Sequence, residues 1–239
     1  MTVAVAIMCK TPAPGLSKTR LSPPLQPEEC AAISACFIQD LSETINSLVQ
    51  DGDVTGYAVF TPAGSESSLR KLLPLDFKLA LQSNGDFGER LLQGVKDLLS
   101  AGHEGAILVN SDSPTLPKVI LQQAVRAIHK GDSVVLSPAA DGGYTLIGLS
   151  RIHERLFEDI PWSTSDVYQL TLERAEEIGL PVVAIQGWYD VDDATSFQML
   201  EDELSGKKLA FESTQIAGAN APATRRFMDE RARQSLRPA

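Results

Sequence analysis

The sequence has 239 residues, a net charge of −10 and a hydrophobic content of 43%, which is enough apolar material for one sizeable core. A chain this acidic lacks the basic surface that nucleic-acid binding needs, and none of its apolar runs approaches the length of a membrane span. Its three cysteines and three histidines have no metal-ligand spacing and argue against a zinc cluster or a disulfide scaffold. We therefore expect a cytoplasmic enzyme or binding domain.

Strand-like and helix-like patterns follow one another along the chain, and this indicates an α/β fold whose central strands are buried and parallel. The strand-like runs are 3–8, 57–60, 77–81, 106–109, 133–136, 144–149 and 181–185. We expect the runs that precede Asp112 and Asp192, 106–109 and 181–185, to be buried and parallel. The helical patterns begin near residues 27, 65, 86, 118, 166 and 194. We expect one domain over residues 1–204, followed by a linker and a peripheral helix within 205–239.

The loop after the first strand, residues 9–21, combines prolines and a glycine with three cations, Lys10, Lys18 and Arg20. The prolines and the glycine prevent regular structure, so the loop can offer backbone N–H groups and cations to a polyphosphate. The other interpretation is a solvated basic turn. That reading is weaker for three cations beside the first strand of an acidic protein.

A polar, glycine-containing segment, residues 82–90, opens the helix that follows the third strand. Asp86 and Glu89 have the spacing of a capping box. Capping would leave Gln82 and Arg90 free to contact a ligand at the helix N-terminus, where anions are favoured.

Asp112 follows the buried run 106–109 and precedes a helix. In open α/β sheets ligands bind beyond the carboxyl ends of the strands, so Asp112 can hold a divalent cation there. Its Asp-Ser-Pro context equally suits a turn. Asp192 is the natural second oxygen ligand, because Asp193 can cap the helix that follows.

Five stretches, in this order, resemble the bacterial family DUF2064, glycosyltransferase-A-like proteins of the nucleotide-diphospho-sugar transferase superfamily, some of which are labelled arsenosugar-biosynthesis glycosyltransferases. They are residues 12–21 (PAPGLSKTRL), 85–90 (GDFGER), 111–116 (SDSPTL), 141–148 (DGGYTLIG) and 190–193 (DVDD). The resemblance covers residues 3–204. It implies a Rossmann-like, mostly parallel sheet flanked by helices, of the glycosyltransferase-A type, in a single domain.

Carried over position by position, the resemblance implies a nucleotide site, an acceptor side and a metal site. The nucleotide would lie against Pro14, Gly15, Lys18 and Arg20 at its phosphates, and against Gln82, Asp86 and Arg90 at its base and ribose. The acceptor side would comprise Asp141, Gly142, Gly143, Trp162 and Ser163. Asp112 and Asp192 would bind Mg²⁺ or Mn²⁺, and Asp112, Asp141 and Lys18 would be catalytic. One departure is Ser111-Asp112-Ser113, which stands where the broad class carries Asp-X-Asp.

Taken alone, some of these residues have simpler interpretations. The Asp141-Gly142-Gly143 turn suits a hairpin, and Trp162 suits the core or a lid.

Three functions are compatible with these residues. The first is a metal-dependent glycosyltransferase that moves a sugar from a nucleoside diphosphate to a small acceptor. The second is a nucleotidyltransferase that uses a nucleoside triphosphate and releases pyrophosphate. The third is a nucleotide-binding module without turnover. The sequence leaves the base, the sugar, the acceptor and the oligomeric state open.

Overall fold

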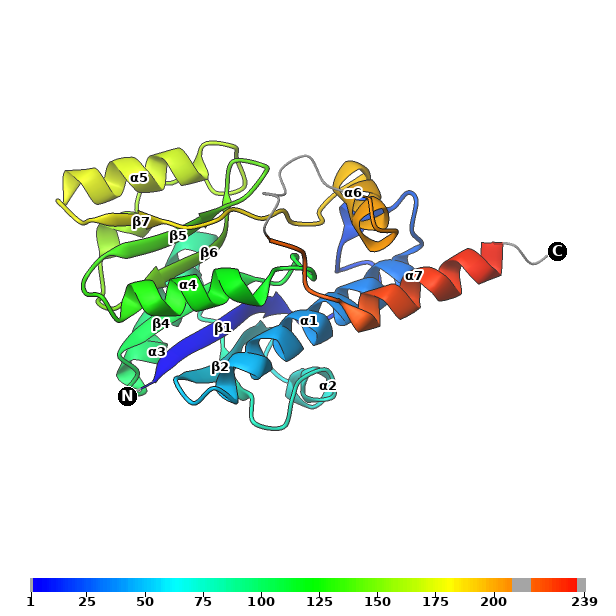
Figure 1. The fold of residues 1–239 in the computed structure, drawn as a ribbon, viewed down its shortest axis with the longest axis horizontal. Coiled ribbons are helices and arrows are strands. Elements are labelled where there is room, and N and C mark those ends of the chain that lie inside the picture. The colour runs from blue at the N-terminus through cyan, green and yellow to red at the C-terminus, as the bar shows by residue number, and fades with distance from the viewer. Residues whose placement is uncertain (1, 208–215, 236–239) are drawn as a thin grey trace.

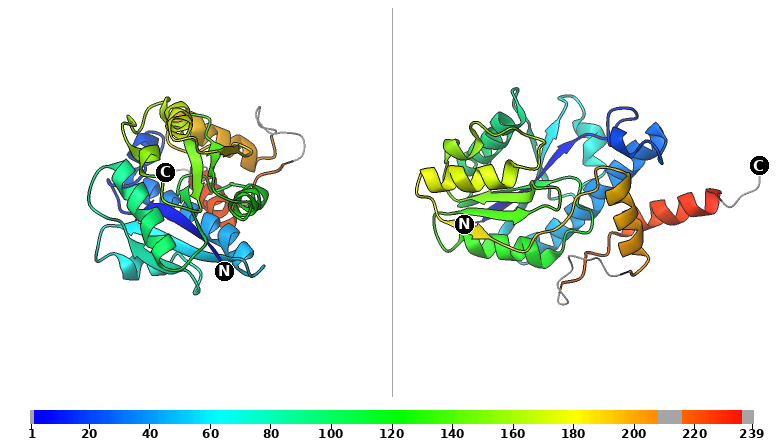
Figure 2. Two further views of the ribbon diagram at one scale, coloured as in Figure 1. Left: turned by 90° about the vertical axis from the view of Figure 1, so that its left-hand side faces the viewer. Right: turned by 90° about the horizontal axis from the view of Figure 1, so that it is seen from above.

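The computed structural model describes residues 2–207 and 216–235, which form an α/β domain around one seven-stranded sheet (Figures 1 and 2). The strand order is β3-β2-β1-β4-β6-β5-β7. The strands are β1 (Val3–Lys10), β2 (Val54–Thr61), β3 (Lys78–Leu81), β4 (Gly105–Asn110), β5 (Val134–Pro138), β6 (Tyr144–Leu149) and β7 (Val182–Ala184). Only β6 runs antiparallel to its neighbours, so the predicted mostly parallel sheet flanked by helices is confirmed.

Helices cover both faces of this sheet. The described helices are α1 (Pro27–Val49), α2 (Glu66–Arg70), α3 (Phe87–Ser100), α4 (Lys118–Ile128), α5 (Val167–Glu177), α6 (Ala194–Leu204) and α7 (Pro222–Ser235), with short 3-10 turns η1 (Thr19–Leu21) and η2 (Glu154–Phe157). Among the described residues, no helix is both long and apolar enough to cross a membrane.

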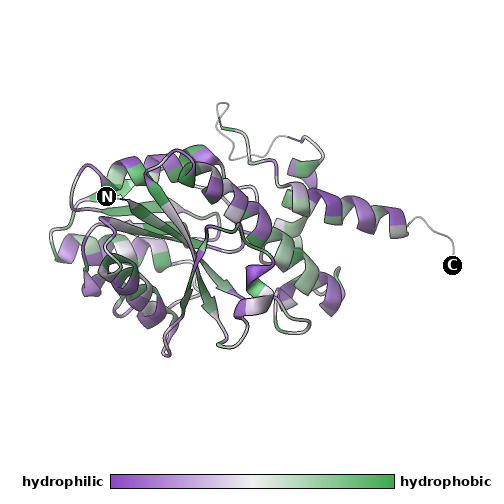
Figure 3. Cartoon of the chain, turned by 90° about the horizontal axis from the view of Figure 1, so that it is seen from below, coloured by the Kyte–Doolittle hydropathy of each residue, from purple (hydrophilic) through white to green (hydrophobic). Residues whose placement is uncertain are grey.

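Alternate residues of β1 supply two separate apolar cores, because successive strand side chains point to opposite faces. Val5 and Ile7 pack with α1 and α4, whereas Ala4 and Ala6 pack with α3 and η2. Figure 3 shows the hydrophobic residues concentrated on the strands and on the helix faces turned toward them. The sheet thus lies between two apolar layers, and loops extend from the ends of its strands.

The sequence predicts a buried strand at 181–185. The strand is present, but the prediction of its burial is wrong. β7 has three residues, pairs only with β5, and lies at the edge of the sheet. Val183 packs against the core, whereas Val182 is 38% exposed. An edge strand of this kind is covered on one side only, which accounts for the exposure.

α7 is the helix expected within residues 205–239, and it lies against α1 (Figure 1). Residues 208–215 of the expected linker lie outside the described residues. The carboxylate of Asp40, on α1, accepts hydrogen bonds from the backbone N–H groups of Ala223 and Thr224, both at 2.8 Å. The Thr224 hydroxyl donates a third bond at 2.6 Å. Asp40 is only 3% exposed, so the first turn of α7 is anchored inside the domain.

Candidate functional site

Three segments that are distant in sequence meet beyond the carboxyl ends of β1 and β4. These strands are parallel neighbours, with Met8 opposite Asn110, so the loop after β1 and the loop after β4 emerge at the same edge. The segment that follows β7 returns along this edge, where the N–H of Val191 donates to the carbonyl of Asp112 at 2.9 Å. This single backbone bond sets Asp192 beside Asp112.

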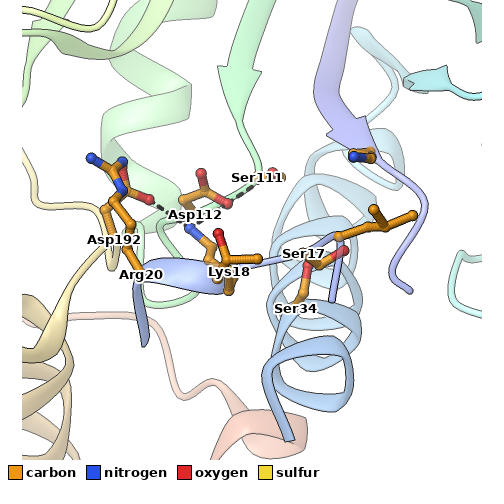
Figure 4. Close-up of a pocket in the computed structure, with 10 residues that line it drawn as sticks. Ser17, Lys18, Arg20, Ser34, Ser111, Asp112 and Asp192 are labelled. Carbon is orange, nitrogen blue, oxygen red and sulfur yellow. Dashed lines mark hydrogen bonds and ion pairs between the residues drawn. The ribbon is translucent and has the colours of Figure 1, made fainter. Parts of the chain in front are cut away.

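Lys18 lies at the centre of this meeting point (Figure 4). Its Nζ is 2.8 Å from Oδ1 of Asp112, 2.7 Å from Oδ1 of Asp192 and 2.8 Å from the carbonyl oxygen of Val191. The Lys18 side chain is only 7% exposed. Burial alone would lower the pKa of Lys18, but the two carboxylates outweigh burial and raise that pKa above its usual value.

Two neighbours complete the cluster. Arg20, whose side chain is 72% exposed, donates through Nη2 to Oδ2 of Asp192 at 2.9 Å. The hydroxyl of Ser111 donates to Oδ1 of Asp112 at 2.9 Å. Lys18 adopts a left-handed backbone conformation, with φ of 50°, which turns its side chain toward the two aspartates as the chain enters η1.

A cavity of about 270 Å³ opens beside this cluster. Its walls combine cations, hydroxyl groups and carboxylates from the β1 loop, α1, the β4 loop and the segment after β7 (Figure 4). The lining residues are Lys10, Leu16, Ser17, Lys18, Thr19, Arg20, Ser34, Ser111, Asp112 and Asp192. Cations and hydroxyl donors in one cavity suit a phosphate-bearing ligand.

The cavity includes only part of the predicted nucleotide site. Lys18 and Arg20 line it, but Pro14 and Gly15 do not. Both are exposed and belong to a turn in which the N–H groups of Leu16 and Ser17 donate to the carbonyl of Ala13. Contact of Pro14 and Gly15 with phosphates stays a prediction.

Asp112 and Asp192 converge, as the sequence predicts, but they converge on an ammonium group. Among the described residues, no cluster of three or more His, Cys, Asp or Glu side chains could hold a metal ion. The two carboxylates are 29% and 32% exposed and offer the oxygen ligands that Mg²⁺ and Mn²⁺ prefer. The residues therefore fit such an ion with a partial shell, provided that the Lys18 ammonium leaves the space between them.

The sequence reasoning did not assign Asp190 a role, although it belongs to the dense carboxylate run 190–193. Burial, followed by the negative charges of Asp141, Asp192 and Asp112, raises the pKa of Asp190 to about 7. The parallel bridge between Ala139 and Trp188 explains why Asp190 lies near Asp141. Asp141 and Asp190 thus place two carboxylates close together, and the pKa of Asp190, at about 7, lies well above its ordinary range.

Gln82 and Arg90 take no part in the capping box, as expected, but both have partners within the chain. The amide of Gln82 donates to the carbonyls of Cys9 and Val59, at 3.1 and 3.0 Å. Its oxygen accepts from Arg90 at 3.2 Å. Gln82 therefore connects β1 and β2 through their backbone carbonyls. Any contact of Gln82 or Arg90 with a base stays a prediction.

The predicted capping box of α3 is confirmed. Asp86 accepts from the N–H of Glu89 at 2.9 Å, and Glu89 accepts from the N–H of Asp86 at 2.8 Å. Asp193 caps α6 in the same way, accepting from the N–H of Ser196 at 2.8 Å. The predicted contact of Asp86 with the nucleotide stays a prediction.

The residues predicted for the acceptor side form one connected surface. Gly142 has a φ of 92°, and a Cβ there would approach the carbonyl oxygen of Ser165 to 2.1 Å, so only glycine fits this contact. The N–H of Gly143 donates to the Asp141 carboxylate at 2.9 Å. The hairpin turn therefore lies directly against the loop that carries Trp162 and Ser163.

Within that loop the two residues differ. Trp162 is half-buried and meets Phe87 edge to face, with ring centroids 5.4 Å apart. It thereby joins the acceptor-side loop to the first turn of α3. Ser163 is exposed, with a φ of 67°.

A bacterial family described as an uncharacterized protein conserved in bacteria, DUF2064, matches residues 44–164. The chain belongs to this family. No curated protein matches the sequence.

Solved structures with the same fold extend over nearly the whole DUF2064 chain. A candidate nucleotide-diphospho-sugar transferase from Desulfovibrio desulfuricans G20 is 26% identical, with a TM-score of 0.81, over 98% of this chain and 96% of that one. A cytidylyltransferase from Leptospira borgpetersenii serovar Hardjo-bovis is 13% identical, with a TM-score of 0.57, over 100% and 99% of the two chains. A CMP:2-keto-3-deoxy-manno-octonic acid synthetase in complex with CTP is 10% identical, with a TM-score of 0.56, over 86% and 99%.

Proposed function

We propose that this DUF2064 protein is a transferase that uses a nucleotide-activated donor, and that it moves a sugar from a nucleoside diphosphate to a small acceptor. The observation that supports the proposal most is the convergence of Lys18, Asp112 and Asp192 beside a cavity lined with cations and hydroxyl groups. The similarity to the candidate sugar transferase of Desulfovibrio points the same way.

The donor diphosphate would occupy the cavity. Lys10 and Arg20 are its accessible cations, and the hydroxyls of Ser17 and Ser34 supply neutral donors. Charge-assisted hydrogen bonds of this kind are about twice as strong as neutral ones. The acidic remainder of the protein would then orient the anionic donor toward this one cationic corner.

Asp112 and Asp192 would hold Mg²⁺ or Mn²⁺ together with diphosphate oxygens. When bound, such an ion neutralises the negative charge that develops on a departing diphosphate. Lys18 and Arg20 add positive charge at the same place. The protein's contribution is therefore to position the leaving group against charges that are already oriented.

In the transfer step, the bond between the sugar anomeric carbon and the diphosphate oxygen breaks, and the acceptor oxygen bonds to that carbon. The acceptor proton has to pass to a base. Asp141 is the candidate from the sequence, and Asp190 is a second one, because its raised pKa of about 7 suits a group that takes up a proton near neutral pH.

Nucleotidyl transfer is the second candidate. Lys10 and Arg20 are both exposed and fit a triphosphate as readily as a diphosphate. Similar folds include a cytidylyltransferase and a CTP-bound synthetase. Binding without turnover is the third candidate, because Ser111-Asp112-Ser113 provides one carboxylate at the end of β4.

A thermal-shift screen with and without MnCl₂ tests these candidates. Nucleotide-sugars, nucleoside diphosphates and nucleoside triphosphates are compared. Stabilisation by a nucleotide-sugar but by no triphosphate supports sugar transfer, and the reverse supports nucleotidyl transfer. Stabilisation by nucleotides without turnover of any of them supports the binding module.

A further inference from the structure

All three donors of the Lys18 ammonium are occupied. A lysine ammonium has three donors, and three oxygens lie within 2.7–2.8 Å of Nζ, from Asp112, Asp192 and Val191 (Figure 4). In this arrangement the ammonium has no donor left for a phosphate. Lys18 can therefore donate to a phosphate only after one of these three contacts is broken, and its predicted phosphate contact stays a prediction.

The ammonium also occupies the position that a divalent cation would need. Both of its charged contacts are to Oδ1 atoms of the two carboxylates that would bind the ion. The remaining oxygen of Asp192 is taken by Arg20 at 2.9 Å. A divalent ion placed between the same two Oδ1 atoms would be repelled by the ammonium, because both are positive and both would have to lie within about 3 Å of these oxygens.

We propose that Lys18 is an internal counter-cation that keeps the divalent ion out of the site until a polyphosphate draws the ammonium away. This inference rests on the proposed function, because it assumes the same nucleotide cavity and the same two metal ligands. Lys18 lines the cavity wall, so phosphate oxygens placed there offer the ammonium a new anionic partner. Metal and nucleotide then bind together, and metal alone binds poorly.

The exchange keeps charge balanced at each stage. Without ligands, Lys18 and Arg20 compensate Asp112 and Asp192. With ligands bound, the Lys18 ammonium neutralises phosphate charge. The divalent ion then neutralises the two carboxylates that the ammonium has left. The site is thereby protected from capturing free metal ions unproductively.

The test uses MnCl₂ alone, with no nucleotide, and follows free Mn²⁺ by electron paramagnetic resonance. Lys18→Met removes the ammonium and keeps most of the side-chain volume, so we expect it to bind Mn²⁺ at least about ten-fold more tightly than the unaltered chain. Lys10→Met is the matched control. It removes the same charge from the same cavity, but Lys10 is exposed, so its effect is expected to be less than about three-fold because solvent screens it.

Equal Mn²⁺ affinities of Lys18→Met and the unaltered chain overturn the proposal. An equal gain in Mn²⁺ affinity in Lys10→Met also overturns it, because the effect would then come from the change in net charge alone. MnCl₂ should also raise the melting temperature of Lys18→Met more than that of the unaltered chain. Lys18→Gln replaces Lys18→Met if the latter does not fold.

Crystals of the unaltered chain soaked in MnCl₂ alone give an answer without any substitution. We expect Nζ of Lys18 to remain between the carboxylates, and metal on Asp112 and Asp192 in such crystals overturns the inference. None of these measurements involves a donor or turnover. A failure here therefore differs from a failure of the proposed function, which would appear in the nucleotide screen.

Discussion

Asp112 lies just beyond β4, and its carboxylate contacts Lys18 and Ser111. The contributions of Asp112 to turnover and to nucleotide binding can be measured separately. Asp112→Asn keeps the shape but removes the charge. We expect kcat to fall by about 10²–10³-fold, the usual cost of losing one electrostatic contact in the transition state. The dissociation constant of the nucleotide should change by less than about ten-fold, because the ion mainly stabilises charge on the leaving group.

Ser111→Ala is the control for this substitution, since it removes only the 2.9 Å hydrogen bond to Asp112. Steady-state kinetics and titration calorimetry on both variants provide the comparison. An Asp112→Asn enzyme with normal kcat and lost nucleotide affinity would show that Asp112 contacts the donor directly.

Asp190 gives a prediction about pH. Its pKa is raised from 3.8 to about 7, mainly by burial and then by nearby carboxylates. The native state therefore holds the proton more tightly than the unfolded chain, and the contribution of Asp190 to stability falls as pH rises from about 4 to 7. Asp190→Asn should be more stable than the unaltered chain above pH 7, on the order of 1 kcal/mol.

Urea melts in EDTA at several pH values measure this difference, which should shrink toward pH 4, near the ordinary pKa of the carboxyl. Asp97→Asn, an exposed carboxylate on α3, is the control. A variant that is less stable at every pH would mean that Asp190 is ionised and favourably paired.

Some contacts of single residues could be predicted from the sequence, and others could not. That Asp112 and Asp192 would meet was predictable, because parallel strands deliver their ends to one edge. That Lys18 would lie between them was not, because its contact with Asp192 spans 174 positions in the chain. The partners of Gln82 were equally hidden, since Cys9 and Val59 belong to two different strands.

At the scale of elements, α3 allows the capping box to be tested. Asp86→Ala removes a carboxylate that accepts from the N–H of Glu89 at 2.9 Å. The expected loss is about 0.5–2 kcal/mol of unfolding free energy, measured by urea melts. Asp86→Asn, which can still cap, should retain most of the stability. An unchanged melt combined with lost nucleotide binding would make Asp86 a ligand contact instead.

Elements with strong local signals were predictable, and those that depend on their neighbours were less so. The long apolar stripe of α1 and the buried run of β4 specify their own type and approximate bounds. The burial of β7 was predicted wrongly because its apolar residues resemble those of a buried strand. Its position at the edge of the sheet depends on the order of all seven strands. Strand order is a property of long-range packing and leaves no local trace.

For the whole molecule, the attachment of α7 is open to test. Asp40→Ala removes three buried hydrogen bonds to the first turn of α7. We expect a loss of about 1–3 kcal/mol, the cost of leaving buried donors unsatisfied, and faster hydrogen exchange confined to α7 and the facing turns of α1. Thr224→Val, which removes only the hydroxyl donor, should show a smaller effect. Uniformly faster exchange would mean that Asp40 supports the whole domain.

We propose that the edge formed by β1 and β4 binds an activated sugar through its diphosphate, and this binding can be tested directly. The most direct measurement follows nucleotide-sugars by phosphorus nuclear magnetic resonance in MgCl₂, with water as a slow substitute for the acceptor. We expect one of them to release its nucleoside diphosphate, and Asp112→Asn to abolish that release. Intact nucleotide-sugars throughout, together with pyrophosphate released from a nucleoside triphosphate, would contradict sugar transfer.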